Sequence, residues 1–79
     1  PHPFVITGDR FWGQVRRGGR HSVRVQRRPL RGGRFRTVAQ VSTNARGYFS
    51  FTLPGRQPGY YRYVYTGPRG TSGTVRVRR

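Results

Sequence analysis

The sequence predicts an all-β protein, a small β-sandwich of six or seven short antiparallel strands with essentially no helix. Short segments in which apolar and polar residues alternate recur along the chain, as expected of strands that bury one face. Turn-forming residues, among them 12 glycines and 6 prolines, separate these segments. No apolar pattern with the helical period runs for a useful length. A chain of 79 residues suits a single domain.

The N-terminal segment is expected to hold the first strand. Residues 4–7 have a strong preference for strands, and residues 11–15 form either a second strand or a bent continuation of the first. Trp12 belongs either to the core, which we expect, or to an exposed interface. We therefore divide the single domain into an N-terminal arm and first strand, residues 1–14, and a sandwich, residues 15–79.

Two later segments show regular alternation. Residues 21–27 are expected to form a strand with Val23 and Val25 facing inward and Arg24 facing outward. The pair Gly32-Gly33 follows it and suits a hairpin turn.

The stretch from Phe35 to Leu53 is expected to form the centre of the core. Its first half, residues 35–42, alternates so that Phe35, Thr37, Ala39 and Val41 share a face, and residues 43–47 form a turn-rich connection. Its second half, residues 48–53, places Phe49, Phe51 and Leu53 on one face, the largest apolar block in the chain. The two halves form either a hairpin or two strands joined by a loop that passes between sheets.

The C-terminal part contains two further expected strands, at residues 60–65 and 74–78. In the first of these, Tyr61, Tyr63 and Tyr65 share a face, which we expect to line the core or its rim. In the second, valines alternate with arginines.

Charge is the strongest compositional signal. All 17 basic residues are arginine, a single acid (Asp9) opposes them, and the formal net charge is +16. A genome that favours arginine over lysine would explain the choice of residue but not the scarcity of acids. Self-repulsion at this density destabilises a compact chain, and an anionic partner relieves it.

The arginines form a candidate surface for anionic polymers, because a guanidinium group binds phosphate, sulfate or carboxylate through a planar set of donors. The alternative is a merely solvated surface. The partner would be a nucleic acid, an acidic polysaccharide or a cell-wall polyanion. Tyr60, beside Arg62, is a candidate for stacking on bases or sugars. The candidate polyanion-binding residues are Arg16, Arg17, Arg20, Arg24, Arg27, Arg28, Arg36, Arg62, Arg76 and Arg78.

The chain lacks the residues that most kinds of catalysis need. Asp9 is the only carboxylate side chain, which excludes a pair of catalytic carboxylates. The chain has no cysteine and only two histidines, and its glycine-rich segments match neither a P-loop nor a dinucleotide fingerprint. We expect no catalytic residue, no metal site and no cofactor. No apolar run approaches the roughly 20 residues that span a bilayer, so no membrane span is expected.

Several segments look like successive strands of a known kind of module. They are Val23–Arg28, Phe35–Ala39, Thr43–Phe51, Tyr61–Gly67 and Thr74–Val77. Together they resemble the immunoglobulin-like modules of secreted and cell-surface bacterial proteins, over roughly residues 15–79. The resemblance implies a β-sandwich and an extracellular setting, and it implies no reaction.

The N-terminal arm has a second interpretation. Phe4, Val5, Ile6 and Thr7 could complete the sheet of another copy, as in donor-strand pili, or could form the module's own first strand. We therefore expect a secreted, non-enzymatic structural module that self-associates, as an oligomer or filament, and binds anionic polymers. The alternative is a nucleic-acid-binding protein whose arginines contact phosphates and whose tyrosines stack on bases.

Overall fold

The structure, a computed structural model, describes residues 3–16, 18–65 and 70–78. The described residues form seven strands and no helix, which confirms the predicted all-β class. Every strand begins and ends within one residue of its predicted bounds. The strands are β1 (Phe4–Thr7), β2 (Arg10–Gln14), β3 (Ser22–Arg28), β4 (Arg36–Ser42), β5 (Tyr48–Thr52), β6 (Gly59–Tyr65) and β7 (Val75–Val77).

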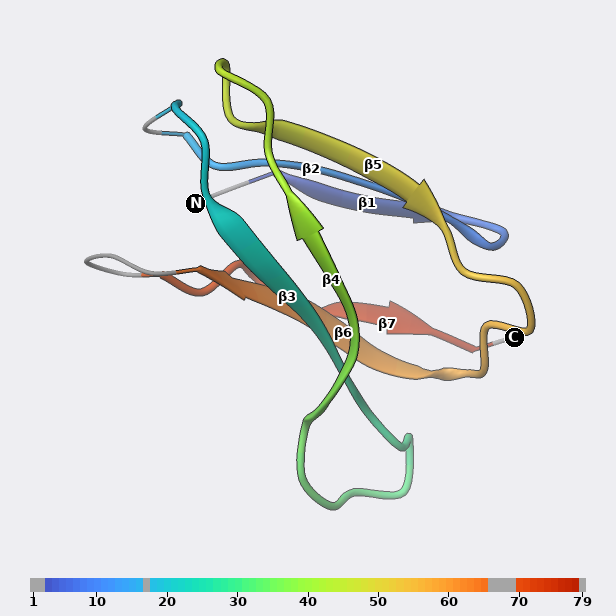
Figure 1. Cartoon of the computed structure of the whole chain (residues 1–79). Coiled ribbons are helices and arrows are strands. Elements are labelled where there is room, and N and C mark those ends of the chain that lie inside the picture. Colours follow the sequence, from blue (N-terminus) through green and yellow to red (C-terminus); the bar gives the residue numbers. More distant parts are fainter. Residues whose placement is uncertain (1–2, 17, 66–69, 79) are drawn as a thin grey trace.

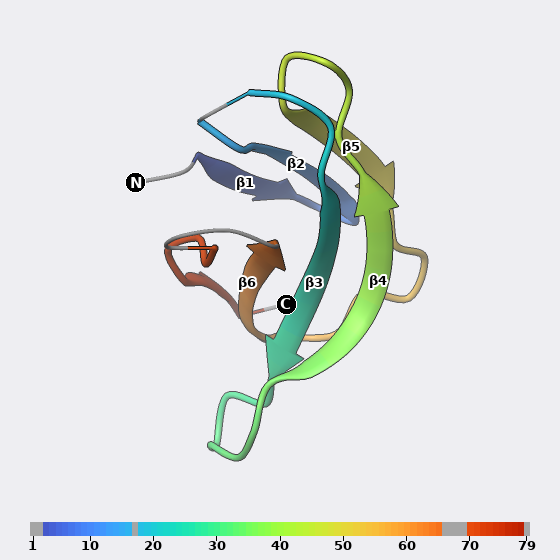
Figure 2. The ribbon, with the colours of Figure 1, turned by 60° about the vertical axis from the view of Figure 1, so that its left-hand side comes forward.

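The strands pair into two antiparallel sheets that face each other (Figure 1). The three-stranded sheet has the order β1-β2-β5, and the four-stranded sheet has the order β4-β3-β6-β7. The chain therefore crosses from one sheet to the other between β4 and β5, so the stretch from Phe35 to Leu53 is not a hairpin. The long β3–β4 hairpin extends beyond the body of the sandwich (Figure 2).

Hydrogen bonds secure the crossing between β4 and β5. The buried Thr43 hydroxyl donates to the carbonyl of Gly19 at 2.8 Å and accepts from the backbone amide of His21 at 2.7 Å. The Asn44 side-chain oxygen accepts from the amides of Arg46 and Tyr48, at 2.9 and 3.1 Å. Such local bonds explain why a polar Thr-Asn pair serves as a rigid connection.

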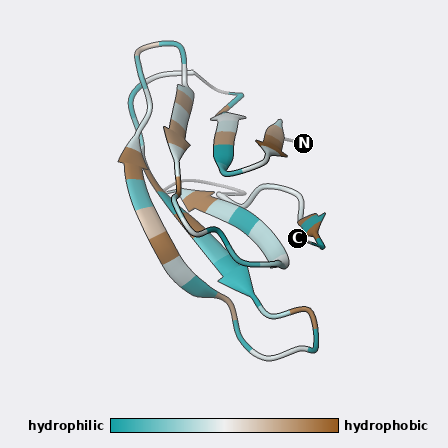
Figure 3. Ribbon diagram, turned by 90° about the vertical axis from the view of Figure 1, so that its right-hand side faces the viewer, coloured by the Kyte–Doolittle hydropathy of each residue, from teal (hydrophilic) through white to brown (hydrophobic). Residues whose placement is uncertain are grey.

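The core is a layer of aromatic rings between the sheets. Tyr63 of β6 meets the rings of Phe4 and Phe49 edge-on, with centroids 5.2 and 5.1 Å apart. Phe11 of β2 meets Tyr61 of β6 in the same way at 5.3 Å. Edge-to-face pairs at these separations add stability beyond the burial of their area. Figure 3 shows apolar and polar residues alternating along several of the strands.

The core differs from the prediction in where its centre lies. Phe11, Val15, Val23, Val25, Tyr61 and Tyr63 are fully buried, whereas the stretch from Phe35 to Leu53 contributes only Phe49 to the buried hydrophobic cluster. Ala39, Val41, Phe51 and Leu53 pack against that cluster and are partly buried. The inward positions predicted for Val23, Val25, Tyr61, Tyr63 and Tyr65 are confirmed.

A β-bulge explains why the predicted face of β4 is right for Ala39 and Val41 but wrong for Thr37 and Phe35. Val25 pairs with Ala39, but the next residue, Gln26, pairs with Thr37, so β4 has an extra residue, Val38. An extra residue reverses the alternation beyond it. Ala39 therefore packs on the core, while Thr37 and, beyond it, Phe35 lie on the outer side of the sheet.

Trp12 is not in the core, contrary to prediction. It is 37% exposed on the outer side of the three-stranded sheet, where its ring lies 5.6 Å from that of Tyr48. The inward position beside it belongs to Gly13, and the Phe49 ring occupies the space above that glycine. A Cβ built on Gly13 would lie 2.5 Å from two atoms of this ring.

We expect Gly13→Ala to lower the free energy of unfolding by about 1–3 kcal/mol, because its methyl group overpacks the core against Phe49. Urea unfolding measures the change. Gly73→Ala is the matched control: a Cβ there meets no atom within 4 Å, so its stability stays the same or rises by less than about 1 kcal/mol. Equal effects of the two substitutions would contradict the packing described for Gly13.

Alkaline pH should unfold this protein through its buried phenols. Burial raises the pKa of Tyr63 well above the ordinary value of 10.0, and Tyr65 raises it further. Burial also raises the pKa of Tyr61, against the opposing effect of Arg27 and Arg56. The contribution of these two neutral phenols to the stability of the fold is complete below pH 10. Above that pH the tyrosines of the unfolded chain release protons that the buried tyrosines of the folded chain retain.

The free energy of unfolding should therefore be steady up to about pH 10 and then fall, by up to about 1.4 kcal/mol per pH unit for each phenol. Urea unfolding at a series of alkaline pH values tests this. Tyr63→Phe should make the alkaline decline shallower. A decline of unchanged steepness in that variant would show that another group causes it.

Candidate polyanion-binding site

The outer face of the four-stranded sheet brings arginines and aromatic rings together. The register pairs Arg28 of β3 with Tyr60 of β6, and Tyr60 with Arg76 of β7. Two residues away along each strand, Gln26 of β3 pairs with Arg62 of β6. Residues paired across antiparallel strands share a face, so these side chains stand in two adjacent rows.

Guanidinium groups lie against the aromatic rings in this region. The guanidinium carbon of Arg28 lies 4.4 Å from the centroid of the Tyr60 ring, and that of Arg62 lies 4.0 Å from the centroid of Phe35. Two longer contacts, Arg28 to Phe35 at 5.7 Å and Arg76 to Tyr60 at 5.9 Å, link these pairs. We call this set, Arg28, Phe35, Tyr60, Arg62 and Arg76, the arginine–aromatic ladder.

The ladder holds its guanidinium groups in defined positions. Each ring supports a guanidinium group through a cation–π contact, which leaves the N–H edges of the arginine free to donate outward. Arg62 is fixed further because its Nε donates to the side-chain oxygen of Gln26 at 2.9 Å. Ordered side chains lose less conformational entropy when they bind an anion.

The electrostatic setting of the face is strongly positive. Arg24 is exposed and alternates with the buried Val23 and Val25, so it lies on the same side as the ladder. Arg78 is exposed one residue beyond the end of β7, and we assign it to this side because the alternation of a strand repeats every two residues from Arg76. With these two, the face has five arginines: Arg24, Arg28, Arg62, Arg76 and Arg78. The only acidic side chain of the protein, Asp9, lies in the turn between β1 and β2, in the other sheet. The face can therefore contact several anionic groups at once.

The remaining predicted arginines lie elsewhere. Arg27 and Arg36 pair with each other across β3 and β4 on the opposite side from Arg28, and Arg27 donates from Nε and Nη2 to the carbonyl of Pro58. Arg16 and Arg20 belong to the connection between β2 and β3. Arg17 lies outside the described residues.

The stacking on bases or sugars predicted for Tyr60 stays a prediction, and the structure shows its ring in contact with arginines. The Tyr60 ring contacts the guanidinium groups of Arg28 and Arg76, so its π-surface holds arginines. Phe35 and Gln26 were missed in the sequence analysis. Phe35 was assigned to the wrong face because the bulge at Val38 leaves no sign in the apolar pattern.

The N-terminal arm forms the first strand of its own sheet. Residues Phe4 to Thr7 pair with β2, from Phe4 opposite Gly13 to Thr7 opposite Arg10. Phe4 and Ile6 pack against the core, while Val5 points outward and is 50% exposed. In this arrangement β1 is an edge strand, and its exchange with another copy remains a prediction.

Within the described ranges, no three histidine, cysteine or acidic side chains gather where they could hold a metal ion. The same residues include no helix of the length and apolar character that would cross a membrane. No family model, curated protein or solved structure matches this chain.

Proposed function

We propose that this protein is a non-enzymatic module that binds anionic polymers on the outer face of its four-stranded sheet. The observation that carries the proposal is the arginine–aromatic ladder, in which Arg28 and Arg62 rest on Tyr60 and Phe35 at 4.4 and 4.0 Å. Arg76 belongs to the same ladder, and Arg24 and Arg78 extend the positive surface beyond it. Phosphate, sulfate or carboxylate groups of the polymer accept hydrogen bonds from the guanidinium edges.

The ladder favours recognition of charge over recognition of bases. A base that stacked on Phe35 or Tyr60 would have to displace the guanidinium group already in contact with that ring. The anionic backbone of a polymer, in contrast, needs only the outward N–H groups. Binding is therefore independent of sequence and depends strongly on salt, and a nucleic acid is one of several polymers that fit.

The secreted, cell-surface setting is part of the proposal and rests on the resemblance to immunoglobulin-like modules. The strand order supports this resemblance. β1, β2 and β5 share one sheet, and β3, β6 and β7 share the other, as strands A, B, E and C, F, G do in immunoglobulin constant domains. Here β4 pairs with β3, whereas the fourth strand of those domains joins the first sheet.

Binding of duplex DNA, as a convenient polyanion, should report the ladder through its salt dependence. Five arginine contacts predict a slope of about −4.5 for log K against log salt, since each contact contributes about −0.9. Arg28→Gln with Arg62→Gln should reduce the slope to about −2.7, because three contacts remain. Fluorescence anisotropy at several salt concentrations measures the slopes.

A matched control removes two arginine charges from outside the proposed face. Arg10→Gln with Arg46→Gln alters two exposed arginines outside the face and should keep the wild-type slope. Phe35→Leu keeps every charge, so the slope should persist while affinity falls about two- to fivefold through loss of the cation–π support. Equal slopes for the two double variants would show that total charge governs binding, and the proposed face would then be wrong.

We retain self-association by strand exchange as a separate proposal. It is supported by the position of β1, which is both the first strand of the chain and the edge of its sheet, so it can leave without unthreading any other strand. A second copy would then supply the strand opposite β2.

Deletion of residues 1–7 should abolish any oligomer seen by sedimentation velocity, and a synthetic peptide of residues 1–7 should bind the truncated chain. An oligomer of unchanged size after the deletion would exclude exchange of β1. Loss of the oligomer without capture of the peptide would also count against it, since the deletion would then act by unfolding the sheet.

A further inference from the structure

The loop between β5 and β6 is fixed against the end of the sandwich. The amide of Leu53 donates to the carbonyl of Asp9 at 2.8 Å, and the amide of Arg56 donates to the carbonyl of Leu53 at 3.2 Å. Arg27 holds the carbonyl of Pro58, and the Tyr61 hydroxyl donates to the carbonyl of Gln57 at 2.5 Å. The backbone of this loop is therefore held in place.

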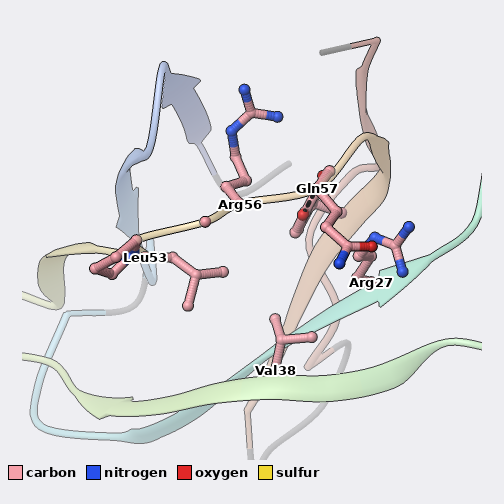
Figure 4. A pocket seen from close by; sticks show the side chains of 8 residues that line it. Arg27, Val38, Leu53, Arg56 and Gln57 are labelled. Carbon is pink, nitrogen blue, oxygen red and sulfur yellow. Dashed lines mark hydrogen bonds between the residues drawn. The ribbon is translucent and has the colours of Figure 1, made fainter.

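A cavity of about 270 Å³ lies under this loop. Figure 4 shows the loop passing above Val38, with the Arg56 side chain extending away from Val38 and the Arg27 side chain lying beside Gln57. The residues around it are two arginines, a glutamine, a tyrosine and apolar residues, and none of them is acidic. The lining residues include Arg27, Val38, Leu53, Arg56, Gln57 and Tyr61.

Arg56 carries buried donors without acceptors. Its Nε and Nη1 atoms are buried, and no hydrogen-bond partner reaches either of them. A charged donor in such a position is costly unless an acceptor pairs with it. Arg56 as a whole is only half-buried, so part of its side chain faces solvent.

The two arginines make different contributions at this end of the sandwich. Arg27 already uses Nε and Nη2 for the carbonyl of Pro58, so it adds mainly positive potential. Arg27 and Arg56 both border the cavity under the loop, so the two arginines belong to the same end of the sandwich. Arg56 has uncommitted donors, and Arg27 supplies a second charge nearby.

We propose that Arg56 anchors a binding site for a single oxyanion group, a phosphate, sulfate or carboxylate, at the β5–β6 loop. The site is separate from the arginine–aromatic ladder. The anion accepts hydrogen bonds from Arg56 and is further stabilised by the charge of Arg27. It is either a free ion or a group carried by a bound polymer.

Urea unfolding in rising inorganic phosphate tests the site, with sodium chloride at matched ionic strength as the reference. A saturable site should lower the unfolding equilibrium constant by the factor 1 + [phosphate]/Kd, or about 11-fold at ten times Kd. General screening of the +16 charge acts in chloride as well and does not saturate. Arg56→Gln should lose the saturable part, while Arg46→Gln, at an exposed loop arginine, should keep it.

Arg56→Met separates loss of binding from loss of folding. In chloride this variant should be at least as stable as the wild type, because an unpaired buried charge is replaced by an apolar chain. In phosphate the wild type should become the more stable of the two. A phosphate effect that is the same in the wild type and in both Arg56 variants would overturn the proposal, as would the absence of a saturable effect in the wild type.

The two proposed sites can fail independently. Arg28→Gln with Arg62→Gln should keep the phosphate effect, and Arg56→Gln should keep the salt slope for duplex DNA. If duplex DNA or an acidic polysaccharide stabilises the wild type in a saturable way, and Arg56→Gln abolishes that stabilisation, the polymer is identified as the source of the bound oxyanion group. Stabilisation by phosphate alone would identify a free ion.

Discussion

The layer of aromatic rings between the sheets is the interaction on which the rest of this protein depends. The chain has no cysteine and a single acid, so neither disulfides nor a set of ion pairs can offset the repulsion among 17 arginines. Cohesion must come from apolar burial. Tyr61 and Tyr63 of one sheet supply it against Phe4, Phe11 and Phe49 of the other. The absence of a side chain at Gly13 lets the Phe49 ring lie close to the backbone of β2.

The same alternation that directs these rings inward directs the arginines outward. On β6, Tyr61 and Tyr63 are buried, so Tyr60 and Arg62 must stand on the outer face. The bulge at Val38 then completes that face by turning Phe35 toward Arg62. The burial of alternate β6 residues in the core and one extra residue in β4 together place guanidinium groups against aromatic rings on the outer face.

The net positive charge links the proposed binding of anions to the stability of the folded state. A folded chain with a net charge of +16 is destabilised by its own field, and any anion that binds the folded state preferentially relieves part of that cost. The proposed polyanion-binding face would do this over an extended surface, and the proposed site at Arg56 would do it for a single anionic group at the β5–β6 loop. A polymer on the outer face and a small anion at the end of the sandwich would stabilise the same fold through different arginines.

Local sequence patterns were enough to place the strands and, for most of them, to identify the side that faces inward. The local period of two is enough for this, as the buried valines of β3 and tyrosines of β6 illustrate. The orientations of Trp12 and Phe35, in contrast, depend on packing and on strand register. The β2 pattern fits either face until the Phe49 ring fills the space over Gly13, and a bulge reverses parity without changing composition. The tertiary structure also decided which arginines share a surface, because that depends on the register between strands distant in the chain, and local alternation carries no information about register.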